Sequence, residues 1–502
     1  MAGEILCRII ESTKDFLKEM PKAIRKKKGQ FFTSMETARY MAGMFDLSSL
    51  PEEINILDPG TGSGILSAAL VERLNLEASV QRIHLTCYEI DTEIRPLLQE
   101  NLARIQEMST IPLEYELLEE NYILSQQHDF KEDFLAVEKQ KKYDLIIANP
   151  PYLRVMRNDA AAAAMPEVVH GAPNMYFLFA AMSLFNLKNN AEMVYIIPRS
   201  WTSGLYFHHF RKYLLTNGKL VQIHLFVSRD KVFKEEEVLQ ETMIIKVKKT
   251  VKEPEFVNLT SSQSSNDFKE TTSFCVPYSS VVAGKDLYVF LPTSLEEMDV
   301  IHKIHRYTHT LPEEGLRMRT GIVVDFRQWD ELRKEPGEHI VPLFYSQHIR
   351  DGRVHHHSSG KEYDWIVDAK PGLIQKNKNY VFCKRFTAKE ERRRLQCGVY
   401  LSEDYPEYAS IGTQNKINYV DLLDGSYMDA QTAYGVYALL NSTLFDQYYR
   451  VLNGSTQVNS TEINSIPVPP FAKIRQIGER VLASGDLTTP ACDQIVMEVA
   501  YG

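Results

Sequence analysis

Cysteine is scarce in this sequence, and its few cysteines stand apart from one another. The chain has six cysteines in 502 residues, and no two of them form a C-x-x-C pair. This distribution excludes a disulfide framework and a zinc site of the usual spacing, and it is typical of a reducing compartment. Three adjacent histidines at 355–357 do not change this, because neighbouring side chains of an extended chain point to opposite faces. We therefore predict no bound metal.

Long apolar runs are also absent. No window approaches the roughly 18 uncharged apolar residues that a membrane-spanning helix needs. The N-terminal stretch GEILCRIIESTKDFLKEM is amphipathic with mixed charge, and it lacks the apolar centre of a signal peptide. We expect a cytoplasmic protein without a membrane partner.

Positive charge is not in excess overall, but it is clustered. The chain has 57 Lys and Arg against 66 Asp and Glu, a net charge of −9. Net charge argues only weakly against a nucleic-acid partner, because binding depends on where the basic residues gather. Nine Lys and Arg lie between Lys370 and Arg394 against two acids, and a second run, KAIRKKKGQFF, lies at 22–32. Either run by itself is typical of a solvated helix face.

Residues 54–250 contain a repeated alternation of short apolar strands with helical stretches. Examples are INILDPG followed by GILSAALVERL, and IHLTCYEID followed by TEIRPLLQENLARIQ. This pattern predicts an α/β fold, with a largely parallel sheet covered by helices. A polar stretch rich in Ser and Thr at 248–273 is typical of a linker or surface excursion. We therefore predict one domain at 1–252, a second at 253–470 in which strands and turns dominate, and a helical tail at 471–502.

A glycine-rich loop follows the first strand of this pattern. The strand ends in Asp58, glycines stand at 60, 62 and 64, and a helix begins behind them. Glycines let the backbone turn tightly and approach a ligand that faces the helix N-terminus. The spacing differs from the dinucleotide pattern G-x-G-x-x-G, and the loop lacks the Gly-Lys-Ser/Thr of a P-loop. Glu89, at the end of the next predicted strand, is placed to accept hydrogen bonds from both hydroxyls of a ribose.

A later strand in YDLIIANPPYLRV ends in Asn149-Pro150-Pro151-Tyr152, which can neither continue a sheet nor start a helix. Together with the glycine loop, this tetrapeptide resembles the amino-methyltransferases that use S-adenosylmethionine. The order of the parts resembles the gamma (TaqI-like) class of DNA adenine-N6 methyltransferases. The resemblance implies a class I S-adenosylmethionine-dependent methyltransferase fold, with a Rossmann-like mixed sheet, and S-adenosylmethionine as the cofactor.

The resemblance also implies the cofactor contacts. The stretch KKGQFFTSMETARYM matches the G-x-x-x-T-P of the class, except that serine stands at the proline position, and its Thr33 would hold the methionine end. Glu89 would hold the ribose. Asn121-Tyr122 is expected near the adenine, with Asp129-Phe130 as the alternative. The predicted cofactor contacts are Thr33, Asp58, Gly60, Gly62, Gly64, Glu89, Asn121, Tyr122 and Asn149.

The chemistry of amine methylation explains the tetrapeptide. An exocyclic amine on an aromatic ring is a poor nucleophile, because its lone pair is delocalised into the ring. The side-chain oxygen of Asn149 and the carbonyl of Pro150 can accept its hydrogens and favour the pyramidal nitrogen that attacks. A duplex base must be flipped out to reach such a pocket, where Tyr152 can stack on it. By resemblance, Phe233 forms the opposite wall, so the predicted catalytic residues are Asn149, Pro150, Pro151, Tyr152 and Phe233.

The second half carries a resemblance of its own. The stretches NYVFCKRFTAKEERRRL and LLNSTLFDQYYRVLNGSTQVNSTEINSIPVPP resemble the target-recognition domain of the PstI/BsuBI-type modification methylases. This implies an α+β domain that binds DNA, in which the basic run faces phosphates. The predicted DNA contacts are Lys384, Arg385, Arg392, Arg393, Arg394, Asn453, Thr456 and Gln457. The side chains that read bases are left open, and so is the recognition sequence, for which the resemblance suggests CTGCAG.

These features predict a site-specific DNA methyltransferase, specific for adenine, that methylates N6 of a flipped base in a short duplex sequence. We expect double-stranded DNA as its partner, a cognate restriction endonuclease as a functional partner, and action as a monomer. Methylation of protein glutamine or of RNA guanine N2 uses the same tetrapeptide and stays open. Cytosine N4 also stays open, although serine is more usual at the first position of the tetrapeptide there. A non-catalytic DNA-specificity subunit is the alternative outside enzymes.

Overall fold

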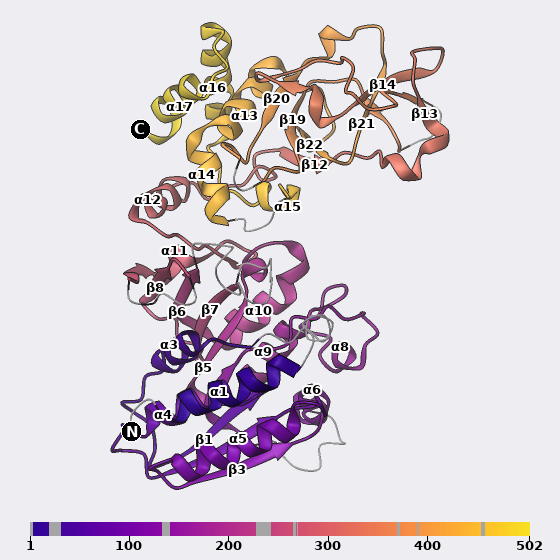
Figure 1. The fold of residues 1–502 in the computed structure, drawn as a ribbon. Helices are drawn as coiled ribbons and strands as arrows, with labels where there is room; N and C mark the ends of the chain where they lie inside the picture. The colour runs from indigo at the N-terminus through magenta and orange to yellow at the C-terminus, as the bar shows by residue number, and fades with distance from the viewer. Residues whose placement is uncertain are drawn as a thin grey trace. The chain divides into compact units, whose positions relative to one another are not determined.

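The structure is a computed structural model, and it divides the chain into two compact units (Figure 1). It describes residues 4–19, 32–132, 141–226, 242–264, 268, 270–368, 372–388, 391–452 and 457–502. The first unit comprises Met1–Thr202 and Tyr206–Val289, and the second comprises Ser203–Leu205 and Phe290–Gly502. Three predicted site residues, Phe233, Asn453 and Thr456, lie outside the described residues.

The first unit is built on a nine-stranded sheet of order β3-β2-β1-β4-β5-β7-β6-β8-β9. Its strands are β1 Glu53–Pro59, β2 Arg82–Tyr88, β3 Leu113–Leu118, β4 Tyr143–Ala148, β5 Leu187–Pro198, β6 Lys219–Phe226, β7 Thr242–Lys248, β8 Phe256–Ser262 and β9 Thr272–Pro277. The strands β1 to β5 pair in parallel, and β7 is antiparallel to both of its neighbours, β5 and β6. This is the mixed Rossmann-like sheet of the class I methyltransferase fold, as the sequence predicted.

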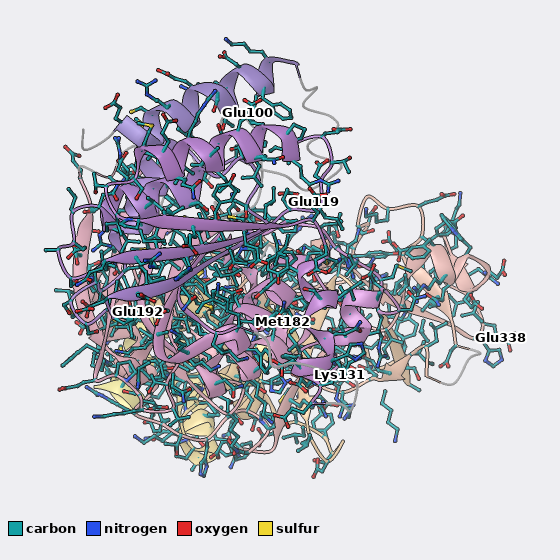
Figure 2. The ribbon with its side chains drawn as sticks, turned by 90° about the horizontal axis from the view of Figure 1, so that it is seen from below. Glu100, Glu119, Lys131, Met182, Glu192 and Glu338 are labelled. Carbon is teal, nitrogen blue, oxygen red and sulfur yellow. The ribbon has the colours of Figure 1, made fainter. Side chains whose placement is uncertain are left out.

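Helices cover this sheet, because its central strands are apolar on both faces. In β4, Leu145 and Ile147 join one core cluster with residues of α1, α3, α4 and α5, while Ile146 between them is equally buried. Figure 2 shows Met182 of α9 among the packed side chains of the interior, whereas Glu100 of α5 is exposed. The helices of the unit are α1 Glu4–Glu19, α3 Met35–Gly43, α4 Ile65–Leu74, α5 Arg95–Met108, α6 Tyr122–Ser125, α7 Gln127–Phe130, α8 Ala160–Ala164, α9 Met175–Asn186, α10 His208–Asn217 and α11 Tyr278–Val281.

The predicted linker at 248–273 is wrong over most of its length. Residues 256–262 form β8, which pairs in parallel with β6, and β9 extends the sheet beyond it. A short hairpin of β10 (Val282–Ala283) and β11 (Tyr288–Val289) follows. The first unit therefore ends at Val289 and not at the predicted residue 252. The Ser and Thr residues of β8 can be buried because their hydroxyls are hydrogen-bonded: those of Thr260 and Ser262 lie 2.9 and 3.0 Å from the ring nitrogens of His224 in β6.

The second unit combines two sheets with helices, which is the α+β organisation that we predicted. One sheet has the order β12-β22-β19-β20-β16-β15 and the other β13-β17-β14-β21-β18. The strands are β12 Leu316–Thr320, β13 Leu332–Arg333, β14 Ile340–Phe344, β15 Ile349–Arg350, β16 Arg353–Val354, β17 Trp365–Val367, β18 Gln375–Lys376, β19 Tyr380–Lys384, β20 Cys397–Tyr400, β21 Ser410–Thr413 and β22 Ile417–Leu422. The helices are α12 Leu295–Ile304, α13 Ala430–Asn441, α14 Thr443–Leu452, α15 Ser460–Ile463, α16 Phe471–Ser484 and α17 Thr489–Val496.

The predicted tail at 471–502 is helical, but it is an integral part of the second unit. Helix α16 packs so closely on α13 that a Cβ atom at Gly435 would collide with the carbonyl of Ile474. A Cβ atom at Gly478 would likewise collide with the carbonyl of Gln431. Among the described residues of both units, no helix is long and apolar enough to cross a bilayer.

Candidate active site and nucleic-acid surface

A cavity of about 570 Å³ opens in the first unit where β1, β2, β3 and β4 end. The carboxyl ends of parallel strands meet at one edge of a sheet, which is the usual place for a ligand in such folds. Seven of the predicted cofactor contacts line the cavity together: Thr33, Gly60, Gly62, Glu89, Asn121, Tyr122 and Asn149.

Each glycine of the loop has a different neighbour. Gly60, Gly62 and Gly64 all adopt positive φ, at 70°, 62° and 88°. A Cβ atom at Gly60 would lie 3.3 Å from the Phe179 ring, and one at Gly64 would lie 3.4 Å from Leu98 of α5. At Gly62 the nearest heavy atom would be 3.9 Å away, so this position faces the open cavity. Gly64 does not line the cavity and instead lets α5 pack against the loop, which corrects its predicted role as a ligand contact.

Glu89 is held in place by backbone amides on both carboxylate oxygens. Its Oε2 accepts a hydrogen bond from the Gly62 amide at 2.8 Å, and its Oε1 accepts one from the Asp91 amide at 2.8 Å. Burial raises the pKa of Glu89, and these two amides oppose that effect. The carboxylate therefore faces the cavity in a fixed orientation, with lone pairs left for a ligand hydroxyl.

Asp58 does not line the cavity, contrary to the prediction. It is fully buried, its Oδ2 accepts a hydrogen bond from the Ser67 hydroxyl at 2.7 Å, and its carbonyl accepts one from the Thr61 hydroxyl at 2.6 Å. Burial raises the pKa of Asp58 to about 7. Asp58 thus supports the loop from behind and does not contact a ligand directly.

A chain of hydrogen bonds connects the loop to the first helix. The Asn101 amide group donates from Nδ2 to the Ser63 carbonyl at 2.8 Å. Its Oδ1 accepts a hydrogen bond from the Ser12 hydroxyl of α1, also at 2.8 Å. Asn101 is completely buried, so its bond to Ser63 is shielded from water, while its bond to the half-buried Ser12 is only partly shielded.

Asn121-Tyr122 lies at the cavity and the alternative pair does not. The Asn121 Oδ1 accepts from the amides of Ile123 and Leu124 at 3.0 and 3.1 Å and so caps α6, which leaves its Nδ2 as a donor. The Tyr122 ring packs against Tyr88, with centroids 5.0 Å apart. Neither Asp129 nor Phe130 lines the cavity.

The tetrapeptide follows β4 directly and reaches the cavity through two of its residues, Asn149 and Pro151. The Asn149 Nδ2 donates to the Thr33 hydroxyl at 3.1 Å, which directs the Oδ1 of the amide away from Thr33. Tyr152 is 8% exposed, its hydroxyl donates to the Ile196 carbonyl at 2.9 Å, and it does not line the cavity. The stacking role of Tyr152 stays a prediction.

The sequence interpretation missed several apolar residues that line the cavity. Among them are Phe32, Ile90, Leu153, Val155, Met175 and Phe179. Ile90 is 61% exposed although it stands only two residues beyond the buried end of β2. The sequence signal was the position of Ile90 directly after Glu89, because a residue next to the ribose-binding carboxylate of a predicted site is a candidate for the cofactor contact.

In the second unit, part of the predicted DNA contacts line a groove of about 1370 Å³. Lys384, Arg392 and Arg393 lie along it. The other charged residues along it carry both signs: Arg350, Arg353, Arg450, Glu296, Glu297, Asp351, Asp446 and Asp486. The groove is therefore mixed in charge, and the basic run does not form a uniformly positive surface.

The prediction that Arg394 faces phosphates is wrong. Its side chain is 1% exposed, with the guanidinium 5.8 Å from the centroid of the Tyr449 ring. The backbone amides of Arg394 and Leu395 both donate to Asp446 Oδ1 at 2.7 Å, which draws this part of the run into the core.

Two further arginines of the run have structural contacts. Arg393 donates to the carbonyls of Leu440 and Ser442 at 3.5 and 3.2 Å, and so it binds the C-terminal end of α13. Arg385 donates to the Asn415 carbonyl at 3.0 Å and does not line the groove. Arg392 is exposed, and it is the arginine of this run that remains most accessible to a phosphate.

The described parts of the chain contain no group of three or more His, Cys, Asp or Glu that could hold a metal ion. Two of the adjacent histidines contact backbone carbonyls: His356 Nε2 lies 2.9 Å from the Asp364 oxygen, and His357 Nδ1 lies 2.8 Å from the His355 oxygen. The histidines thus stabilise a loop of the second unit.

Comparison with known proteins finds a family and two relatives that cover much of the chain. Residues 68–233 match the family described as Eco57I restriction-modification methylase. The type II methyltransferase M.PstI of Providencia stuartii is 33% identical over 488 residues, which cover 95% of this chain and 94% of that protein. M.BsuBI of Bacillus subtilis is 33% identical over 461 residues, 90% of each chain. Among solved structures, the type IIL restriction-modification enzyme MmeI in complex with DNA matches with a TM-score of 0.48 and 13% identity, over 98% of this chain and 73% of that one.

Proposed function

Because the chain belongs to the type II restriction–modification methyltransferases related to M.PstI and M.BsuBI, we propose that it methylates adenine N6 in a short duplex sequence. The observation that carries the proposal is that the glycine loop, Glu89 and Asn149 line one cavity. A ribose-binding carboxylate and an amine-orienting amide in the same space are what an amino-methyltransferase needs.

The cavity fits S-adenosylmethionine, which supplies an activated methyl group when it is bound. Its volume of about 570 Å³ lies within the usual range of ligand pockets, roughly 300–1,000 Å³. Glu89 would accept from the ribose hydroxyls, and Thr33 would lie near the methionine end. The exposed Ile90 offers an apolar surface for the adenine ring, and the free Nδ2 of Asn121 offers a donor to a ring nitrogen.

Asn149 and Pro150 prepare the attacking amine. The Asn149 Nδ2 donates to Thr33, which turns the Oδ1 of the amide away from Thr33, and this Oδ1 would accept a hydrogen of the adenine amine. The Pro150 carbonyl, stiffened by two consecutive prolines, accepts the other. Two acceptors stabilise the pyramidal nitrogen most strongly in the transition state. A neutral amide at position 149 also avoids a full negative charge beside the methyl donor.

The DNA must deliver its adenine as a flipped base. We propose Tyr152 and Phe233 as the walls between which the base stacks, an interaction worth roughly 1–3 kcal/mol for each stacked base. The groove of the second unit, with Lys384 and Arg392, would bind the phosphate backbone. Methylation at N6 would then protect the site from a cognate restriction endonuclease.

Methylation mapping tests this proposal directly. The protein is expressed in a host that lacks adenine methylation, and genomic DNA is sequenced by a method that distinguishes N6-methyladenine from N4-methylcytosine. We expect N6-methyladenine at one short motif, and none with the folded Asn149→Ala variant as control. The proposal would be contradicted by N4-methylcytosine at the motif. It would also be contradicted if no base were modified although the expressed protein binds S-adenosylmethionine.

A further inference from the structure

A second, smaller pocket adjoins the cavity in the first unit. It has a volume of about 210 Å³ and is lined by Arg154, Asn174, Tyr176, Pro198, Ser200, Tyr206 and Phe207. We propose that this Arg154 pocket binds a backbone phosphate of the DNA, next to the nucleotide that is methylated. The proposal rests on the proposed function, because it names a further contact of the same substrate.

The two pockets share a thin wall. Arg154 and Asn174 form an isolated antiparallel bridge, and hydrogen bonds of 2.8 Å join Met175 N to the Leu153 carbonyl and Val155 N to the Pro173 carbonyl. Side chains of extended segments alternate between faces. Leu153 and Met175 accordingly line the larger cavity, while Arg154 and Asn174 line the smaller pocket. The wall starts directly after the Asn149–Tyr152 tetrapeptide, so a nucleotide held at Asn149 has the pocket beside it.

The lining has the chemistry of a phosphate site. Arginine, serine, asparagine and tyrosine are among the side chains that contact phosphates in protein–DNA complexes. Arg154 lies with its guanidinium carbon 5.8 Å from the centroid of the Tyr206 ring. None of the described residues that line the pocket is acidic. The pocket therefore has one positive charge, several neutral polar groups and no negative charge to repel an anion.

One buried hydroxyl of the pocket, that of Tyr176, is poorly satisfied. Tyr176 is 2% exposed, and among the described residues its hydroxyl has no partner in good hydrogen-bond geometry. Burial raises the pKa of Tyr176, and the hydroxyl of Ser200 is close enough to oppose that effect, so the Tyr176 hydroxyl stays protonated at neutral pH and can donate. A buried hydroxyl with so poor a partner is unfavourable, and a phosphate oxygen in the pocket would accept its hydrogen.

The test combines two variants with altered DNA. Arg154→Met keeps the length of the side chain and removes its charge, and Arg157→Met is the matched control, because Arg157 is exposed and does not line the pocket. We expect Arg154→Met to weaken binding of duplex DNA about 10-fold and to reduce the slope of log K against log salt by about 0.9, with cofactor affinity unchanged. Arg157→Met should change neither quantity to this extent.

Neutral methylphosphonate linkages then identify the phosphate. Each linkage flanking the methylated adenine is replaced in turn. In the parent protein one replacement should weaken binding about 10-fold, and in Arg154→Met the same replacement should have no further effect. Tyr176→Phe should also weaken DNA binding while leaving the thermal stability of the free protein unchanged or higher, which a purely structural hydroxyl would not do.

Two results would overturn the inference. They are an unchanged salt slope in Arg154→Met, and equal sensitivity of parent and variant to every methylphosphonate. The proposed function fails separately, if the parent protein methylates no DNA.

Discussion

Gly62→Val should abolish cofactor binding while leaving the first unit folded. Gly62 is the loop position that lines the cavity, because the nearest heavy atom to a Cβ there, among the described residues beyond its chain neighbours, is 3.9 Å away on Phe32. A valine side chain would therefore enter the cavity and not the core. Its amide would still be available to the Glu89 carboxylate, which it now reaches at 2.8 Å.

In Gly62→Val, the loss of folding stability and the loss of cofactor affinity should differ enough in size to be measured separately. Gly62 has φ of 62°, and a residue with a Cβ atom loses roughly 1–2 kcal/mol in this conformation. For a unit of this size the loss corresponds to a fall in Tm of roughly 2–8 °C. Overpacking a fitted site costs up to about 3 kcal/mol, which is roughly 100-fold in affinity. We expect at least this loss for S-adenosylmethionine.

Gly284→Val is the matched control. Gly284 also has positive φ, at 80°, with no heavy atom within 4 Å of its Cβ position, but it lies in the β10–β11 hairpin away from the cavity. Calorimetric titration with S-adenosylmethionine and thermal unfolding are measured on both variants. Both should lose similar stability, and only Gly62→Val should lose the cofactor. A folded Gly62→Val protein with the affinity of the parent would remove this loop from the site.

Three further predictions follow from the site and the groove. Asn149→Ala should lower the single-turnover rate of methyl transfer about 100- to 1,000-fold with little change in DNA affinity, and an unchanged rate would exclude the acceptor role. Asp58→Asn should remove a pH dependence of the free energy of unfolding, because burial raises the pKa of Asp58 to about 7 in the folded protein. As the pH rises from 5 to 8, the free energy of unfolding of the parent should fall by about 2–3 kcal/mol relative to that of the variant. Urea unfolding of both proteins at the two pH values measures this difference. Arg392→Gln should weaken DNA binding at all sequences and reduce the slope of log K against log salt by about 0.9. Arg393→Gln should mainly lower the free energy of unfolding, by about 1 kcal/mol, because Arg393 binds the C-terminal end of α13. Equal effects of the two variants on DNA binding and on stability would refute the assignment of Arg392 to DNA and of Arg393 to the fold.

The sequence predicted the parts of the site whose chemistry is local. The glycine loop, Glu89 and Asn149 each follow a strand directly, and parallel strands bring such positions to one edge of the sheet. Spacing therefore sufficed to place them together. Spacing could not show that Asp58 points away from the cavity, because that depends on the Ser67 hydroxyl of a helix packed behind the loop.

The basic run illustrates what the sequence could not predict. The Lys and Arg residues of the run cannot be told apart in the sequence, but in the structure Lys378 forms an ion pair with Asp421 at 3.1 Å and Arg394 is buried. Which charges stay accessible depends on carboxylates supplied by β22 and α14, more than 25 residues later in the chain. A similar limit applies to β8, whose Ser and Thr residues give no apolar signal and which becomes a strand by pairing with β6.

The bond chain from Ser12 through Asn101 to Ser63 has a consequence for how the N-terminal helix α1 moves. A ligand that immobilises the glycine loop also fixes the Ser63 carbonyl, which accepts from the Asn101 Nδ2. The Asn101 side chain is then held in one orientation, and its Oδ1 in turn holds the Ser12 hydroxyl of α1. Thermodynamic linkage works in both directions. Opening of α1 should therefore become rarer when the cofactor site is filled, and slower hydrogen exchange of the amides around Ser12 would report occupancy of a pocket that this helix does not line.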